Sequence, residues 1–133
     1  MKRTLVGRTA ALVTGVLVAT TLVAAPLTAS AKDGDIITRG SCTARSDWKL
    51  KLSPENGRIE VEFEVDQNRN GQAWNVTMKR NGNAFWRGTR TTQPPSGSFE
   101  VRRVVSNGAG ADRIVVRARH AASGEICRGV ATF

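Results

Sequence analysis

The stretch RIEVEFEVD, residues 58–66, has the pattern that decides the fold of this chain. Every second residue in it is apolar and the residues between are charged, with the apolar set formed by Ile59, Val61, Phe63 and Val65. Successive side chains of a β-strand point to opposite faces, so this alternation is typical of a strand with one buried and one solvated face. Such half-buried strands are characteristic of antiparallel sheets.

The same period of two continues on both sides of this stretch. Turn residues separate the alternating segments, and the Asn-Gly pair at residues 81–82 is typical of a tight hairpin. Two irregularities are expected: one of the adjacent aromatics Phe85 and Trp86 faces solvent or a bulge, and Arg102-Arg103 interrupts the alternation as a bulge would. The pattern predicts seven strands, near residues 48–52, 58–66, 74–79, 84–91, 99–105, 113–119 and 125–133.

Strands at this spacing, with no helical period after residue 31, predict an all-β fold. We expect a seven-stranded antiparallel sandwich of the immunoglobulin-like or fibronectin type III-like kind, following a cleaved helical signal peptide. It differs from antibody domains because the chain has no tyrosine, and hence no tyrosine corner. With no internal repeat in sight, residues 42–133 form the single predicted sandwich domain.

Residues 1–31 have the features of a secretory signal peptide. A basic start precedes a mostly apolar run at residues 10–25, and the small-x-small pattern that follows predicts cleavage after Ala31. A retained membrane span is disfavoured because the apolar run is shorter than the ~20 residues that a span needs. Lipid attachment at Cys42 is rejected because this cysteine lies well downstream of the apolar run. Residues 32–41 are predicted to be a flexible leader, and the mature protein to be secreted without membrane association.

The chain is basic, with 20 Lys and Arg residues against 11 Asp and Glu residues and a formal net charge of +9. Removal of residues 1–31 takes away three basic residues and no acidic one, which lowers the net charge from +9 to +6. Such a balance favours anionic partners, although net charge also keeps a secreted domain soluble. No nucleic-acid recognition motif accompanies the charge, so no specific nucleic-acid partner is expected.

Cys42 and Cys127 are the two cysteines of the chain. In an oxidising compartment they are expected to form a disulfide that closes nearly the whole domain. A metal site built on two cysteines would need further ligands, and the one histidine, His120, lies within an alternating segment. In the chain-entropy model such a disulfide stabilises the fold by about 4.5 kcal/mol.

Several segments of the chain resemble small secreted proteins of actinobacteria. The resemblance is carried by SDWKLKLSP at residues 46–54, RIEVEFEVDQNRNG at 58–71, GSFEVRR at 97–103 and the closing cysteine segment. It covers most of the chain after residue 31. It implies export, the disulfide and an immunoglobulin-like or fibronectin-like sandwich, and it points to no activity and no site residue.

The segment DQNRNG, residues 66–71, is similar to the start of a calcium-binding loop. Asp66, Asn68 and Asn70 stand at alternate positions and Gly71 follows, which supplies some of the oxygen ligands that calcium prefers. A threonine takes the place of the bidentate glutamate that ends such a loop, and the flanking segments are predicted strands. A turn between strands is therefore the favoured interpretation, with weak calcium binding as an alternative. No metal or other cofactor is expected.

The charged face of residues 58–66 carries alternate carboxylates, which lie about 7 Å apart on a strand. That spacing suits a hydrolase pair on distance alone. We favour a solvated face whose carboxylates pair with arginines of a neighbouring strand, with Arg113, Arg117 and Arg119 as the predicted partner row. The carboxylates concerned are those of Glu60, Glu62, Glu64 and Asp66.

One histidine is available for a catalytic triad. His120 with Asp112 and Ser123 has the residue types of such a triad, but the chain has no nucleophile elbow and no oxyanion motif. It also has no phosphate-binding loop and no zinc cluster. The protein is therefore expected not to be an enzyme.

Aromatic residues beside arginines give the best candidate for a binding surface. Trp48 and Trp74 alternate with polar residues and are predicted to lie in the core. Trp86 stands next to Arg87 and near Arg90, and an exposed aromatic beside arginines can hold sugars, bases or a protein.

The sequence favours a non-catalytic, disulfide-stapled secreted sandwich that binds an anionic cell-envelope component or a protein. A carbohydrate-binding module that uses exposed Trp86 is the first alternative, and weak calcium binding at residues 66–71 is the second. Exposure of Trp86 separates the first two hypotheses, because burial would remove the sugar platform. The candidate ligand-binding residues are Trp86, Arg87, Arg90, Arg117 and Arg119.

Overall fold

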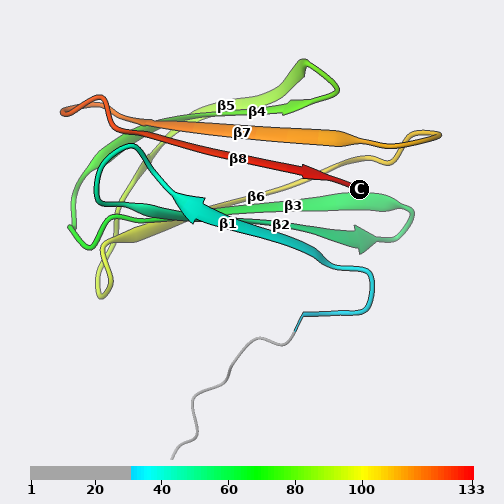
Figure 1. The fold of residues 1–133 in the computed structure, drawn as a ribbon, viewed down its shortest axis with the longest axis horizontal. Helices are drawn as coiled ribbons and strands as arrows, with labels where there is room; N and C mark the ends of the chain where they lie inside the picture. The colour runs from blue at the N-terminus through cyan, green and yellow to red at the C-terminus, as the bar shows by residue number, and fades with distance from the viewer. Residues whose placement is uncertain (1–30) are drawn as a thin grey trace, which may run out of the picture.

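The alternating segments form two four-stranded antiparallel sheets that pack face to face as an open sandwich (Figure 1). The computed structural model describes residues 31–133, so the predicted signal peptide, apart from Ala31, lies outside the described residues. The first sheet has the strand order β1-β2-β3-β6 and the second sheet the order β5-β4-β7-β8. Within the described part of the chain, no helix is long and apolar enough to span a bilayer.

Each sheet takes strands from both halves of the domain. The first sheet consists of β1 (Ile36–Ser41), β2 (Asp47–Glu55), β3 (Arg58–Asp66) and β6 (Ser98–Ser106). The second sheet consists of β4 (Ala73–Arg80), β5 (Asn83–Thr91), β7 (Arg113–His120) and β8 (Ile126–Thr132). All neighbouring strands pair antiparallel, as the alternation in the sequence predicts.

The core lies between the two sheets and is built from the alternate apolar residues of the inner strands. The apolar residues of β3 are completely buried, which confirms the pattern of residues 58–66. They pack against the inner face of the second sheet, where Trp74, Val76 and Met78 of β4 are also buried. Burying one such side chain stabilises the fold by about 1.5–3 kcal/mol.

The prediction of seven strands is wrong by one, because β1 forms in the segment that was predicted to be a flexible leader. It pairs with β2 along its whole length, from Ile36 opposite Leu52 to Ser41 opposite Asp47. The sequence signal is weak there because Gly40, an inward-facing position, has no side chain. A Cβ at Gly40 would lie 2.7 Å from an indole atom of Trp48, so the Trp48 ring occupies that space.

The predicted disulfide between Cys42 and Cys127 is confirmed. Cys42 directly follows β1 and Cys127 lies in β8, so the bond joins the edge strands of the two sheets. The sulfur–sulfur distance is 2.00 Å, and Cys127 is fully buried. The bond therefore closes one open side of the sandwich.

Of the two predicted irregularities, one is found. The register of β4 and β5 shifts between Met78 and Lys79, and this shift leaves Phe85 as the extra, unpaired residue. The bulge predicted at Arg102-Arg103 is wrong, because β6 pairs with β3 in unbroken register. The alternation is broken because Arg103 takes an inward-facing position, opposite Val61.

Candidate functional site

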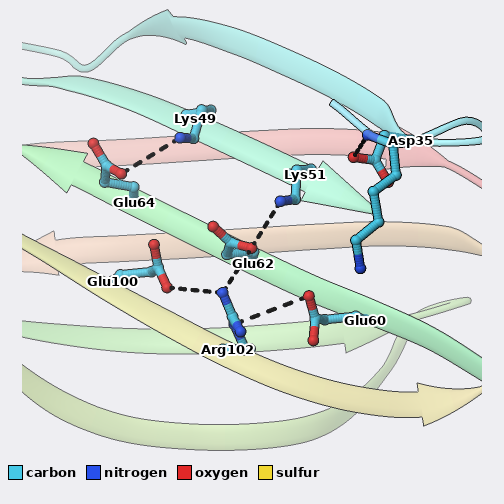
Figure 2. A network of polar contacts seen from close by, with 9 residues as sticks. Asp35, Lys49, Lys51, Glu60, Glu62, Glu64, Glu100 and Arg102 are labelled. Atoms are coloured by element: carbon cyan, nitrogen blue, oxygen red, sulfur yellow. Dashed lines mark hydrogen bonds and ion pairs between the residues drawn. The ribbon is translucent and has the colours of Figure 1, made fainter. Parts of the chain in front are cut away.

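The outer face of the first sheet carries the alternate carboxylates of β3, and Figure 2 shows how they are paired. Lys49 lies 3.5 Å from Glu64, and Lys51 lies 3.1 Å from Glu62. Both lysines belong to β2, the strand directly beside β3. The prediction that these carboxylates pair across strands is confirmed for Glu60, Glu62 and Glu64. Asp66 has no ion pair among the described residues, and the predicted partner row is wrong.

Arg102 of β6 completes this network from the other side of β3 (Figure 2). Its guanidinium lies 3.3 Å from Glu62, 3.9 Å from Glu60 and 3.8 Å from Glu100. Figure 2 shows the three carboxylates arranged around this one arginine. The outer face of the first sheet is thus largely neutralised within the molecule.

Two carboxylates of this network have shifted pKa values. Burial raises the pKa of Glu62, but hydrogen bonds from Lys51 and Glu100 and the charges of Lys51 and Arg102 outweigh burial and hold it below its ordinary value. The pKa of Glu100 is raised, first by burial and then by the charge of Glu62 beside it. The two carboxyls therefore influence each other, because the charge of Glu62 disfavours ionisation of Glu100.

The second sheet is different, because its four strands contain basic residues and no Asp or Glu. Arg113, Arg117 and Arg119, the arginines predicted to pair with β3, are exposed on the outer face of β7, on the other side of the sandwich from β3's carboxylates. Among the ion pairs of residues 31–133, none involves an outward-facing cation of this sheet. These cations therefore have no ion-pair partner in the part of the chain that the structure describes.

A hollow of about 430 Å³ lies on the outer face of the second sheet and gathers these cations. We call it the basic hollow. It takes five cations from all four strands, and it has Val115 in its wall. Its lining residues are Thr77, Lys79, Gly82, Arg87, Arg113, Val115, Arg117 and Arg128.

The pairing register sets out part of this lining as a row across the strands. Arg87 of β5 stands opposite Thr77 of β4, Thr77 opposite Arg117 of β7, and Arg117 opposite Arg128 of β8. Residues in register share a face, so all four side chains project to the same outer side. Like charges directly opposite each other destabilise a sheet, and the Arg117–Arg128 pair is such a case.

Trp86 lies on the other face of β5 and is separated from the basic hollow. It stands opposite Met78 and faces inward, whereas its neighbour Arg87 faces outward. The Trp86 ring is half-buried, and the guanidinium carbons of Arg90 and Arg103 lie 4.8 Å and 4.5 Å from its centre. These are cation–π contacts that cover an aromatic at the open side of the sandwich. The structure thus divides the predicted patch between two faces.

Arg119 is exposed on the same outer face as Arg117, at the end of β7. Its guanidinium lies beside Gly124, where an added Cβ would be 3.3 Å away. Arg119 is not among the residues that line the basic hollow. It extends the basic face toward the turn between β7 and β8.

The DQNRNG segment connects β3 of the first sheet to β4 of the second, so it is a crossing between sheets. The Asp66 carboxylate accepts a hydrogen bond from the Asn68 backbone N–H at 3.1 Å, and Asn68 has a positive φ of 56°. These features define an Asx turn, in which the Asp side chain serves the local backbone. Nowhere in residues 31–133 do three His, Cys, Asp or Glu side chains gather as a metal site would require.

The three residues of the proposed triad are not assembled. Asp112 directly precedes β7 and pairs with Arg80 at 2.7 Å, whereas His120 ends the same strand, about 26 Å away along the chain. His120 Nδ1 lies 2.7 Å from the Ser123 hydroxyl, and its Nε2 lies 2.9 Å from Gln72. The buried His120 therefore bonds to loop residues on both of its ring nitrogens.

A second hollow, of about 460 Å³, lies between the turn of the β4–β5 hairpin and the end of β6. Its lining mixes two arginines with apolar residues, including Phe85 and the exposed Val104. One of these arginines, Arg80, already has Asp112 as its partner. Arg58 is thus the one cation of this hollow without an ion pair among the described residues, against five in the basic hollow.

The fold and the surface together define a small, disulfide-linked antiparallel sandwich with one internally neutralised face and one basic face. No protein-family model, no curated protein and no solved structure matches this chain. The basic hollow is therefore a candidate site on the evidence of its geometry and charge alone. Sequence reasoning found two of its cations, Arg87 and Arg117, as binding candidates.

Proposed function

We propose that this protein is a secreted, non-catalytic binding module that holds an anionic polymer of the cell envelope in its basic hollow. The sandwich that carries the hollow is, on this proposal, of the immunoglobulin-like or fibronectin type III-like kind. The observation behind the proposal is that five cations line one hollow on a sheet without Asp or Glu.

The charge distribution supports this proposal more strongly than net charge does. On the first sheet, two lysines lie 3.1–3.5 Å from carboxylates of the same sheet. The outward-facing cations of the second sheet have no such partners among residues 31–133, so their field is directed outward. A surface of one sign raises the local concentration of oppositely charged ligands and speeds their association.

The disulfide supports the secreted location that this proposal assumes. A bond between Cys42 and Cys127 forms and persists in oxidising surroundings and is rare in the cytosol. Envelope polymers outside the cytoplasm that carry phosphate or carboxylate groups are the abundant anionic ligands that such a protein would meet.

The test is a fluorescence titration of the oxidised protein without residues 1–31 against labelled polyphosphate and labelled polyglutamate at several salt concentrations. We expect binding that weakens steadily as salt rises, because counterions compete for the same charges. In the triple variant Arg87→Gln, Arg117→Gln, Arg128→Gln, affinity should fall about 100-fold, at ~1 kcal/mol for each basic contact.

A matched triple variant controls for net charge. Arg39, Arg45 and Arg69 are exposed and lie outside the basic hollow. Changing these three to Gln removes the same charge, so its affinity should stay within about threefold of the unchanged protein. Equal loss in both triple variants would show that the hollow is not the site.

A further inference from the structure

We propose that the row formed by Arg87, Thr77, Arg117 and Arg128 recognises phosphate groups, so that the polymer held in the basic hollow is a phosphate polymer that crosses the strands. This inference rests on the proposed function and specifies its ligand. It adds that guanidinium geometry, and not charge alone, decides what is bound.

The row has the dimensions of an extended site. Neighbouring strands lie about 4.8 Å apart, so the row from β5 to β8 is roughly 14 Å long. Its cations come from β5, β7 and β8, and the Thr77 hydroxyl fills the position on β4. A ligand with several anionic groups in line can contact the row along its whole length.

The Arg117–Arg128 pair offers two guanidiniums to one anion. The two residues are directly opposite in the register of β7 and β8, and both are exposed. An anion placed between their guanidiniums would remove a like-charge repulsion and gain hydrogen bonds from both. Arginine forks match the oxygens of phosphate in a bidentate way that the point charge of lysine does not.

The composition of the hollow agrees with this chemistry. Four of its five cations are arginines and one is Lys79. On the first sheet, the carboxylates are met by two lysines and by the single arginine Arg102. Phosphate is tetrahedral, so it accepts hydrogen bonds from donors outside one plane, such as Arg87, Thr77 and Arg117. A planar carboxylate forms two good hydrogen bonds to one guanidinium and gains less from further donors outside its plane.

The experiment uses a variant that keeps every charge. Arg117→Lys with Arg128→Lys removes both guanidiniums and leaves the net charge unchanged. We expect the affinity for polyphosphate to fall at least about tenfold, while the affinity for polyglutamate changes less than about twofold. Arg45→Lys with Arg69→Lys, at exposed positions outside the hollow, should leave both affinities unchanged.

A second arm separates a polymer from a single phosphate group. Inorganic phosphate should bind the unchanged protein at least about 100-fold more weakly than polyphosphate, because a polymer engages the row at several points. The far-ultraviolet circular dichroism spectrum and thermal midpoint of each variant check that the sandwich is intact.

The outcomes distinguish this inference from the proposed function. If the Lys variant binds polyphosphate as tightly as the unchanged protein, or if polyglutamate binds equally well and responds equally, phosphate recognition is overturned while anion binding stands. If neither polymer binds the unchanged protein, the proposed function fails and this inference fails with it.

Discussion

Trp86 shows how single residues close an open sandwich. Its ring lies over Gly88, two residues along the same strand, and under the guanidinium of Arg103 from the other sheet. Inward-pointing charges on edge strands are a known device against edge-to-edge aggregation, and here Arg90 and Arg103 occupy such places. The indole lets both arginines lie at the margin of the core, because cation–π contact compensates part of their desolvation.

The close fit of Trp86 over Gly88 yields a stability prediction. A Cβ at Gly88 would collide with the Trp86 indole, so Gly88→Ala should lower the free energy of unfolding by about 1–3 kcal/mol in chemical denaturation. In a Trp86→Val background the clash is absent, and the same change should cost less than about 0.5 kcal/mol. An equal cost in both backgrounds would show that the indole does not occupy this space.

The Glu62–Glu100 pair yields a prediction of pH dependence. The folded-state pKa of Glu100 is raised, so its stabilising contribution is present at acidic pH and is lost as the pH rises through that value. Glu100→Gln should therefore increase stability at pH 7, by about 0.5 kcal/mol or less because Glu100 is partly exposed, and give no gain near pH 3.

The opposite sign applies to Glu62, whose folded-state pKa is lowered. Its contribution is present above the ordinary carboxylate range and is lost as the pH falls through the folded-state value. Glu62→Gln should lower stability at pH 7 by about 1–3 kcal/mol, since Lys51 and Arg102 lose a buried partner. Thermal midpoints of both variants between pH 3 and pH 7 check the two signs together.

At the scale of strands, the period of two was sufficient to predict most of the fold. The strand at residues 58–66 was predicted correctly because its apolar and charged residues alternate without a break. The β1 strand was missed because Ile36 is followed on its inner face by Thr38 and Gly40, and the Trp48 ring fills the space at Gly40. A false bulge was predicted in β6 because Arg103 replaces an apolar residue at an inward position, which only the contact with Trp86 explains.

The candidate site was predicted only in part for a related reason. Trp86 and Arg87 are adjacent in the sequence, so they were grouped, yet adjacent residues of a strand face opposite ways. The parity of the strand would have assigned Arg87 to the outer face from the sequence. The strand order that places Arg128 beside Arg117 was not available from the sequence, because it depends on which strands are neighbours.

The link between β1 and β8 yields a prediction about the disulfide. Its cysteines are 85 residues apart, so reduction frees nearly the whole domain in the unfolded state. The variant Cys42→Ala with Cys127→Ala should lose about 4.5 kcal/mol of stability in urea denaturation by the chain-entropy model. A loss below about 1 kcal/mol would show that residual structure already restrains the unfolded chain, so that the chain-entropy model does not apply to this bond.

At the scale of the whole molecule, charge is distributed by sheet. Carboxylates and cations neutralise each other on the first sheet, whereas the outer face of the second sheet holds cations alone. Carboxylates opposite Arg117 and Arg128 would stabilise the second sheet, as the β2 lysines opposite the β3 carboxylates do in the first sheet. The proposed function accounts for their absence, because surfaces that bind charged ligands commonly keep repulsion that lowers stability.

This interpretation predicts an exchange between stability and binding at Arg128. In low salt and without ligand, Arg128→Gln should raise the free energy of unfolding by about 0.2–1 kcal/mol, because it relieves a like-charge pair with Arg117. The gain should shrink as salt screens the repulsion. The same variant should bind polyphosphate less tightly and gain less thermal stabilisation from it. A variant that is less stable than the unchanged protein at low salt would show that Arg128 is kept for packing, and the charge of the second sheet would then need another explanation.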